Sequence, residues 1–255
     1  MTGSVLANIH IILVGTKHPG NIGSVARAMR NMGISHLRLA APQCSINEES
    51  YRLARSGGPI LESARRCRST ASALRGIGLV AGTSSKTGGN RGQAYPPHAL
   101  APRLIAQAAT QKVGILFGPE DTGLVDGDIM LCGTLIRIPT PPDARSINIS
   151  HAVMIVCYEL FLASLVRPPE RVPKLARLEQ VEAMYIQLEE SLRRIGFLND
   201  KTARHMMFSL RRLLGRAGLE ETDVAILRGI ARQIAWCAGR TGDPSVPVSP
   251  QVEGR

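Results

Sequence analysis

Hydrophobic residues before position 140 fall into short runs of strand length. Each run is rich in isoleucine, valine and leucine, and a loop and a stretch with helical spacing follow it. This alternation is typical of a parallel α/β sheet that helices cover on both faces. The predicted strands are 9–15, 36–40, 77–82, 113–118 and 134–139.

Helical spacing predicts helices between these runs. Gly33 is expected to end the first of them, because glycine readily adopts the left-handed conformation that follows a helix. The apolar run 152–166 is interrupted by Glu159 and is shorter than the ~20 residues of a membrane-spanning helix, so a buried helix is predicted there. The predicted helices are 21–33, 98–110, 125–132 and the segment from Asn148 onward.

The pattern changes after a segment with three prolines, VRPPERVP, which predicts a linker. Beyond it, helical spacing predicts three helices, roughly 174–195, 200–215 and 221–238, and no strand. The last residues are rich in proline, serine and glycine and are expected to be disordered. The predicted units are an α/β domain at 1–166, a linker at 167–173, a helical extension at 174–240 and a tail at 241–255.

The net charge indicates more about the binding partner than the chain length does. The 255 residues are 44% hydrophobic and 20% charged, an ordinary composition for a globular chain. The net charge of +11 and the pI of 10.1 favour a polyanionic partner such as nucleic acid. Aromatic residues make up only 4%, which disfavours a single-strand binder that stacks bases on aromatic side chains.

Cysteines and histidines do not indicate a metal site. The five cysteines are odd in number and scattered, and the six histidines lack ligand spacing. The N-terminal stretch MTGSVLANIHIILVG has no basic residue before its apolar part, so no signal peptide is expected. We therefore expect a cytoplasmic protein with no membrane partner and no metal.

Three loops follow predicted strands at the edge where open α/β sheets bind ligands. In the first, Gly20, Asn21 and Gly23 precede a helix that presents Ser24 and Arg27. Backbone amides in such a turn can bind a phosphate, although neither the dinucleotide nor the P-loop glycine pattern is present. The alternative is a tight turn with a solvated arginine.

The second and third loops carry polar side chains. LFGPEDTGL (116–124) places Glu120 between two glycines, which suits either a ligand-binding loop or an exposed turn. IPTPPDARSINISHAV (138–153) leads into the long apolar run, and its Ser146 or Asn148 suits the N-cap of the helix that follows. Capping and a functional role are compatible for these two side chains.

Together these loops resemble a known family. SPOUT-class RNA ribose methyltransferases of the TrmH-like branch have three motifs that are similar, in order and spacing, to NIGSVARAMRNMG, LFGPEDTGL and IPTPPDARSINISHAV, and the resemblance covers residues 8–165. The helical extension resembles the C-terminal domain of TrmJ-type tRNA (cytidine/uridine-2'-O)-methyltransferases in LEESLRRIGFLND, LRRLLGRAGL and DVAILRGIARQI.

The resemblance implies a fold, a reaction and partners. It implies the SPOUT fold, in which the parallel sheet ends in a deep trefoil knot, here at residues 113–165. It implies methylation of a tRNA ribose with S-adenosylmethionine, at cytidine or uridine 32 of the anticodon loop. It also implies a homodimer in which the first motif of one subunit completes the active site of the other, with no metal.

The same resemblance implies site residues, carried over position by position. The cofactor residues are Thr83, Ser84, Ser85, Gly118, Ile138, Arg145, Ser146 and Ile147. The catalytic residues are Asn21, Arg27, Glu120, Ser146 and Asn148. The RNA-binding residues are Arg27 and, in the basic stretch of the extension, Arg193, Arg194, Arg204, Arg211 and Arg212.

Methyl transfer to a ribose 2'-hydroxyl requires alignment of the oxygen, the methyl carbon and the sulfur. A guanidinium with a pKa above about 12 is a poor general base. We therefore expect Arg27 to donate hydrogen bonds to the developing alkoxide or to bind the adjacent phosphate with both arms. Ser146 and Asn148 are expected to orient the ribose and the methionine end of the cofactor.

Three alternatives stay open at this point. The first is an enzyme of the same class that acts on ribosomal RNA or on another tRNA position, although the TrmJ-like extension argues against it. A non-catalytic RNA-binding protein on the same fold would not need all five catalytic residues. A nucleotide-dependent oxidoreductase would carry a glycine fingerprint that this chain lacks.

Overall fold

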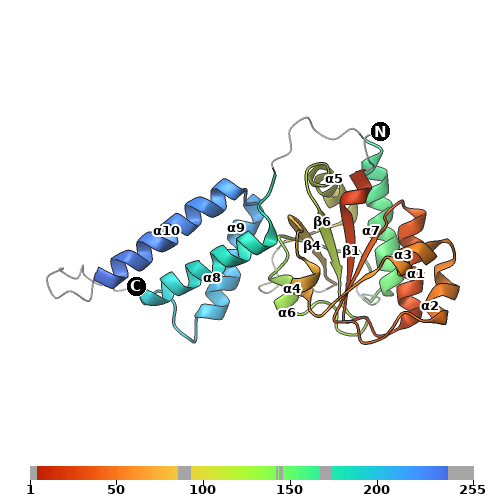
Figure 1. Ribbon diagram of the computed structural model, residues 1–255, viewed down its shortest axis with the longest axis horizontal. Coiled ribbons are helices and arrows are strands. Elements are labelled where there is room, and N and C mark those ends of the chain that lie inside the picture. Colours follow the sequence, from red (N-terminus) through yellow and green to blue (C-terminus); the bar gives the residue numbers. More distant parts are fainter. Residues whose placement is uncertain (1–4, 86–92, 142, 144–145, 167–173, 241–255) are drawn as a thin grey trace.

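The computed structural model describes residues 5–85, 93–141, 143, 146–166 and 174–240, apart from the side chains of residues 216, 217 and 240. We refer to 5–166 as the α/β region and to 174–240 as the helical extension. The α/β region contains a seven-stranded parallel sheet in the order β3-β2-β1-β6-β4-β7-β5 (Figure 1). The strands are β1 Ile9–Val14, β2 His36–Ala40, β3 Arg65–Cys67, β4 Leu79–Thr83, β5 Ala94–Tyr95, β6 Val113–Phe117 and β7 Thr134–Ile136.

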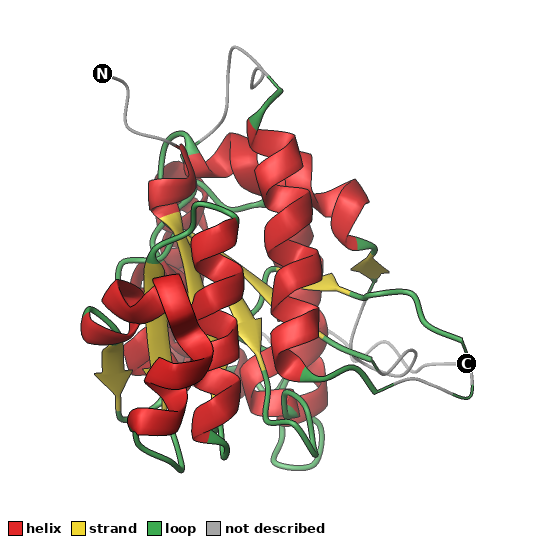
Figure 2. Ribbon diagram, turned by 90° about the vertical axis from the view of Figure 1, so that its right-hand side faces the viewer, coloured by secondary structure: helices red, strands yellow, loops and turns green. Residues whose placement is uncertain are grey.

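Helices cover the sheet on both faces, and Figure 2 shows several of them side by side in front of the strands. In the α/β region the helices are α1 Pro19–Asn31, α2 Glu48–Ala54, α3 Gly58–Glu62, α4 Thr70–Ala73, α5 Pro97–Ala108, α6 Asp126–Ile129 and α7 Ile149–Ser164, with short 3₁₀ turns η1 Val5–Asn8 and η2 Arg55–Gly57. The extension consists of α8 Leu178–Arg194, α9 Ala203–Ala217 and α10 Glu221–Arg240.

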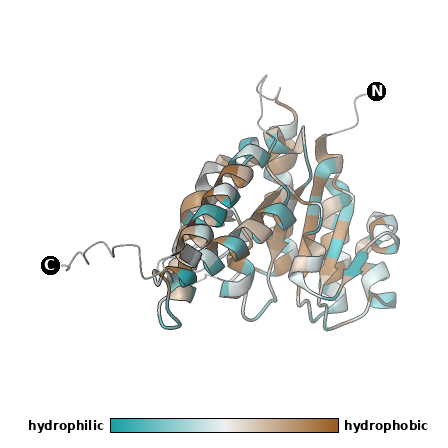
Figure 3. Ribbon diagram, turned by 60° about the vertical axis from the view of Figure 1, so that its left-hand side comes forward, coloured by the Kyte–Doolittle hydropathy of each residue, from teal (hydrophilic) through white to brown (hydrophobic). Residues whose placement is uncertain are grey.

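Strand β1 shows why helices pack on both faces of the sheet. All six of its residues are buried, and successive side chains of a strand point to opposite faces. Ile9, Ile11 and Leu13 join the core under α1, α5 and α7. Ile12 and Val14 join a second core on the other face, beside α4 and α6. Figure 3 shows the resulting concentration of hydrophobic positions in the sheet.

The helical extension has a small core of its own and also contacts the sheet. Met184, Tyr185 and Met207 are buried in a cluster formed by its three helices. Leu178 and Phe208 pack against the second core of the sheet. The extension is also held by hydrogen bonds from its first helix: Leu178 N donates to Ile77 O at 3.0 Å, and Gly76 N donates to the Glu179 carboxylate at 2.7 Å.

The predicted fold class is confirmed: a parallel sheet with covering helices, followed by a small helical unit. The short strands β3 and β5 and the helices α2 to α4 were not predicted. Gly33 follows α1 with a φ of +70°, as expected for a C-terminal cap. The knot at 113–165 and the domain boundaries stay predictions, and the predicted linker and tail lie outside the described residues.

The prediction of a buried helix at 152–166 is wrong for one face of α7. Val153, Val156 and Leu160 are buried, but an apolar stripe on another face is exposed. Its members recur at helical spacing. We call Ile155, Tyr158, Leu162 and Leu165 the α7 stripe. No helix within the described ranges is both long and apolar enough to cross a membrane.

Candidate functional site

A cavity of about 450 Å³ opens at the carboxyl ends of β4, β6 and β7. Small-molecule sites typically occupy roughly 300–1,000 Å³, so this volume suits a small organic ligand. Hydroxyl groups line one part of it and isoleucine side chains line another. The lining comes from Thr83–Ser85 after β4, the segment 117–124 at the end of β6, and Ile138, Ser146 and Ile147 after β7.

The loop after β6 folds back on itself because two of its residues are glycines. A Cβ on Gly118 would overlap the backbone of Gly123 and Leu124. Gly123 has a φ of +66°, in the region that favours glycine, and its amide donates to Pro119 O at 2.9 Å. This tight turn brings Glu120 to the wall of the cavity.

A chain of hydrogen bonds joins the three loops beside this cavity. Asn21 Nδ2 donates to Glu120 Oε1 at 2.7 Å, and Asn148 Nδ2 donates to Asn21 Oδ1 at 3.2 Å. The amide and hydroxyl of Ser150 both donate to Asn148 Oδ1, at 2.9 and 2.7 Å. Because Oδ1 accepts both bonds, the Asn148 amide group can only present Nδ2 to Asn21.

Asn148 therefore has two structural functions. It is the N-cap of α7, where its side-chain oxygen accepts from the Ser150 amide, as expected for a capping asparagine. Its side-chain nitrogen meanwhile connects the third loop to the first. The cap and the connection to Asn21 use different atoms of one side chain, so the predicted cap is confirmed, while the catalytic role of Asn148 stays a prediction.

An ion pair forms a second connection between the first and second loops. Lys17 Nζ lies 2.6 Å from Asp121 Oδ2, and both side chains are partly exposed. The hydrogen bond from Lys17 lowers the pKa of Asp121, so the carboxylate stays charged at neutral pH. Together with the Asn21–Glu120 bond, this pair holds the loop after β1 against the loop after β6.

One oxygen of Glu120 lacks a partner. Oε2 is buried and accepts no hydrogen bond from any residue that the structure describes. An unsatisfied buried acceptor is costly, which indicates that a ligand donor belongs beside it. Burial, with a contribution from Glu120, raises the pKa of the nearby Cys44 thiol, so this thiol is protonated at neutral pH.

The structure brings most of the predicted cofactor and catalytic residues to one place. Arg27 is the exception, because it lies exposed on α1 and does not line the cavity. Arg145 lies outside the described residues. Those that line the cavity are Thr83, Ser84, Ser85, Gly118, Glu120, Ile138, Ser146 and Ile147, and Asn21 and Asn148 are bonded to this group.

Gly20, Asn21 and Gly23 lie within the first turns of α1, so the prediction that they precede the helix is wrong, and the two glycines have a packing function. A Cβ on Gly23 would overlap the backbone of Ser50, and one on Gly20 would lie 2.7 Å from the Glu49 carboxylate. Both glycines thus let α1 approach α2 closely. This packing does not support the prediction that the two glycines shape a phosphate-binding turn.

Two of the predicted RNA-binding arginines make ion pairs within the extension. Arg193 lies 2.9 Å from both Glu189 and Asp200. Arg211 pairs with Glu182 through both arms of its guanidinium and lies 4.3 Å from the Tyr185 ring centroid. These partners already neutralise much of the charge that an RNA phosphate would meet.

The remaining arginines of this group lie at the surface. Arg194, Arg204 and Arg212 are exposed. Arg194 and Arg204 form no ion pair with any residue in the described part of the chain. The basic stretch therefore separates into arginines that stabilise the helices and arginines that face solvent.

Sequence reasoning missed Lys17, Asp121 and Ser150. Ser150 continues the alternation of Ser146 and Asn148, which was a usable signal. Lys17 and Asp121 lie next to two of the loops with opposite charges, but their separation of 104 residues hides the pairing.

Metal-binding clusters do not occur among the described residues, since no group of three or more His, Cys, Asp or Glu side chains converges there. All five cysteines are free thiols. Burial raises the pKa of Cys132 and Cys157, so neither is a reactive thiolate at neutral pH.

Similar proteins of known family define the class of this chain. Residues 8–158 match the SpoU rRNA Methylase family, and residues 179–243 match the C-terminal domain of the tRNA methyltransferase TrmJ. The chain is therefore a methyltransferase of the SpoU class. The cavity and the hydrogen-bonded loops described above all lie within the part that matches this family.

Relatives that match about nine tenths of the chain define the family more narrowly. A TrmJ from Pseudomonas aeruginosa, a tRNA (cytidine/uridine/adenosine-2'-O-)-methyltransferase, is 35% identical over 89% of this chain and 93% of its own length. The crystal structure of TrmJ from Z. mobilis has a TM-score of 0.77 and 31% identity, and covers 88% of this chain and 98% of that one. A probable methylase family protein from Haemophilus influenzae has a TM-score of 0.61 and 33% identity, and covers 92% and 99%. The chain belongs to the TrmJ family.

Proposed function

We propose that this protein transfers a methyl group from S-adenosylmethionine to the ribose 2'-hydroxyl of a tRNA pyrimidine at position 32 of the anticodon loop. The observation that carries this proposal is the chain of hydrogen bonds from Ser150 through Asn148 and Asn21 to Glu120 at the edge of the cavity. This chain of hydrogen bonds includes at least one residue from each of the three family motifs.

The cavity suits the cofactor in size and in chemistry. S-adenosylmethionine, when bound, supplies a methyl group on a positively charged sulfur that a ribose oxygen can attack. Ile138 and Ile147 offer apolar surface for a purine ring, while Thr83, Ser84 and Ser85 offer hydroxyls for polar groups. The unpartnered Oε2 of Glu120 can accept from a hydroxyl or ammonium group.

The residues of this chain contribute by alignment and by charge stabilisation. Holding two reactants in line can lower the barrier by as much as roughly 7–11 kcal/mol in well-oriented systems. The Asn148 amide is fixed by Ser150 and Asn21, so it costs little reorganisation when it contacts a ribose. Arg27 supplies the positive charge and paired donors for the developing alkoxide or the neighbouring phosphate.

The positions of Arg27 and the α7 stripe support a homodimer. Arg27 does not line the cavity of its own chain, so it acts most directly on the cavity of a second copy. The α7 stripe, with Leu165 at 67% exposure, follows the apolar pattern of a helix that packs against another protein surface. In such a dimer, Arg27 from the first motif of one subunit completes the active site of the other, while Asn21 stays bonded within its own chain.

Mixing two inactive variants tests this arrangement. Arg27→Ala and Asn148→Asp each remove one half of the proposed composite site. A dimer with one subunit of each kind contains one intact site if Arg27 acts across the interface, so the mixture should regain activity. Unchanged inactivity after subunit exchange, verified by mass spectrometry of tagged chains, would contradict an Arg27 that acts on the partner.

The substrate follows from the helical extension and the basic surface. Arg194 and Arg204 are suited to phosphates of a folded RNA, and the TrmJ relatives are named for tRNA ribose methylation. A structural neighbour with a TM-score of 0.51 and 25% identity is described by the methylation of C/U34 on tRNA, which makes position 34 the alternative.

Single deoxynucleotides distinguish the two positions. A tRNA with a 2'-deoxynucleotide at position 32 lacks the proposed acceptor and should not be methylated, whereas one with a 2'-deoxynucleotide at position 34 should be a normal substrate. The reverse result would move the proposed site to position 34. The name of the Pseudomonas aeruginosa relative also includes adenosine. Methylation of a tRNA with adenosine in place of the pyrimidine at position 32 tests whether this protein has the same wider specificity.

A further inference from the structure

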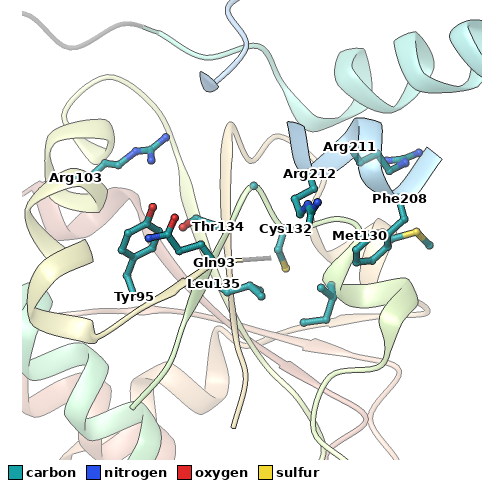
Figure 4. Close-up of a pocket in the computed structure, with 12 residues that line it drawn as sticks. Gln93, Tyr95, Arg103, Met130, Cys132, Thr134, Leu135, Phe208, Arg211 and Arg212 are labelled. Atoms are coloured by element: carbon teal, nitrogen blue, oxygen red, sulfur yellow. The ribbon is translucent and has the colours of Figure 1, made fainter. Parts of the chain in front are cut away.

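A second cavity lies between the sheet and the helical extension, apart from the site described above. Its volume is about 110 Å³, and it shares no lining residue with the larger cavity. Figure 4 shows Arg103 and Tyr95 on one side, Arg211 and Arg212 on the other, and Thr134 between them. Residues from α5, β5 and β7 thus face residues from α9 across this space.

The lining of this second cavity is strongly basic. Three arginines and no Asp or Glu line it. Arg211 is held by Glu182, so its charge is largely compensated. Arg103 is exposed, and no carboxylate within the described ranges pairs with it. The uncompensated charge of Arg103 leaves positive potential in a confined space, which favours an anionic ligand.

A buried hydroxyl on the wall provides independent evidence for a ligand. Thr134 is only 7% exposed, and its Oγ1 has no hydrogen-bond partner among the described residues. A buried hydroxyl without a partner costs roughly 1–3 kcal/mol, so evolution would be expected to prefer valine at this strand position unless a ligand uses the oxygen. The hydroxyl can donate to an anionic oxygen.

We propose that this cavity binds a phosphodiester group of the tRNA substrate, held by Arg103 and Arg212 with a hydrogen bond from Thr134. A space of about 110 Å³ is smaller than small-molecule sites, which run to roughly 300 Å³ or more, yet it accommodates a single phosphate. Guanidinium groups bind phosphate with two parallel hydrogen bonds. This inference rests on the proposed tRNA substrate.

A phosphate bound here would contact both parts of the molecule at once. Arg103 belongs to α5 of the α/β region, and Arg212 belongs to α9 of the helical extension. The RNA backbone would therefore connect the two parts, in addition to the contacts between Leu178 and Ile77 that already join them. Binding of tRNA would strengthen the attachment of the extension to the sheet.

Two substitutions in the full-length protein test the proposal. The affinity of each variant for tRNA is measured at several salt concentrations, in the absence of S-adenosylmethionine. Arg103→Gln should weaken tRNA affinity about 3- to 10-fold and reduce the slope of log affinity against log salt by about 0.7–1, as expected for one lost phosphate contact. Thr134→Val should weaken affinity about 2- to 5-fold with an unchanged slope, because it removes a neutral donor.

A matched control and two further measurements make the outcome decisive. Arg68→Gln removes an exposed arginine just beyond β3, at the opposite edge of the sheet, and should change affinity less than about 1.5-fold. Thr134→Val should melt at the wild-type temperature or above it, since the free protein loses an unsatisfied hydroxyl. S-adenosylmethionine affinity should be the same in all four proteins.

Arg103→Gln with the tRNA affinity of Arg68→Gln would overturn the proposal. Loss of inorganic phosphate binding in Arg103→Gln, measured by calorimetry, with tRNA affinity unchanged would also overturn it, because the cavity would then serve a free anion. If the wild-type protein binds tRNA through Arg103 but does not methylate it, this inference holds while the proposed reaction fails. The two proposals are thus tested separately.

Discussion

The α/β region and the helical extension use polar side chains in opposite ways. In the α/β region, the hydrogen bonds of the site join residues 99, 104 and 127 positions apart. In the extension, Arg193 binds carboxylates 4 and 7 positions away, and Arg211 binds one 29 positions away. The first pattern fixes the geometry of several loops relative to one another, whereas the second joins neighbouring parts of the helical extension, such as α8 and α9.

The polar side chains of the two regions therefore have different functions. The groups that we propose to align the reactants lie where the sheet brings distant loops together, and their orientation is fixed by neighbours. Groups that bind a polyanion need charge more than exact orientation, and the exposed arginines of the extension meet that need. Substitutions in the two regions should therefore affect turnover and affinity differently.

The largest effect is expected for Asn148→Asp. Aspartate keeps the oxygen that caps α7 but loses the Nδ2 donor to Asn21, and it places a second carboxylate near Glu120. We expect kcat to fall about 100- to 1,000-fold, as for loss of a preorganised donor. Single-turnover methylation assays measure this, with circular dichroism to verify the fold.

The control for this variant is Asn148→Ala, which removes both the cap and the donor. It should lose activity to the same extent and also lose about 1 kcal/mol of unfolding free energy, because the cap is gone. Near-wild-type activity in Asn148→Asp would mean that Asn148 serves only as a cap.

Glycine substitutions compare the packing of the two regions. Gly23→Ala forces a methyl group into the backbone of Ser50 and should destabilise the protein by about 3 kcal/mol, at the upper end for overpacking. Gly229→Ala in α10 meets only the end of the Arg232 side chain and should stabilise it by up to ~1 kcal/mol. Urea denaturation measures both, and equal effects would contradict the difference in packing.

Acid should destabilise the α/β region through His10. Burial, with Arg38 and His36 nearby, lowers the pKa of His10 to about 3, whereas the unfolded chain titrates at 6.5. The unfolded state therefore gains the proton first, and stability is lost as pH falls below 6.5. From pH 7 to pH 5, this one group should cost about 2 kcal/mol.

His10→Phe keeps the ring stacked on His36 but cannot titrate. Its loss of stability between pH 7 and pH 5 should be smaller than that of wild type by that same ~2 kcal/mol. Parallel stability curves for the two proteins would show that His10 titrates normally in the folded state.

Arginine-to-lysine substitutions separate alignment from charge. Arg27→Lys keeps the charge and loses the planar fork, so turnover should fall about 10-fold. Arg204→Lys in the extension should leave both turnover and tRNA affinity within about 2-fold of wild type, because charge is sufficient there. Wild-type turnover in Arg27→Lys would contradict a two-armed contact by Arg27.

The smallest effects are expected within the extension itself. Arg204→Gln should weaken tRNA binding about 3-fold, because its guanidinium faces solvent without a carboxylate partner in the described structure. Arg193→Gln should weaken it less, since Glu189 and Asp200 already neutralise that charge. Filter binding at constant salt compares the two, and an equal loss would mean that the ion pairs open when RNA binds.

The sequence predicted the long strands and helices because their hydrophobic periodicity is strong. Strands β3 and β5 have only three and two residues, too few for any period to be visible. The exposed stripe of α7 was also missed, because a helix that is apolar on nearly every face carries no signal for which face packs inside.

Several residues that the family motifs indicated lie around one cavity, whereas the long-range contacts between loops were missed. Thr83 and Ile147 were placed by the resemblance, and both line the cavity. The pairing of Lys17 with Asp121 could not be predicted, because the sequence does not reveal which exposed charges of two loops meet. The ion pair of Arg211 with Glu182 was missed for the same reason.

The most direct test of the central claim is ribose methylation itself. Purified protein is incubated with methyl-labelled S-adenosylmethionine and unmodified tRNA, and the product is digested with alkali. A 2'-O-methyl group blocks cleavage of the adjacent phosphodiester, so we expect label in an alkali-resistant dinucleotide. Label in mononucleotides would mean base methylation and would contradict the proposed ribose methylation.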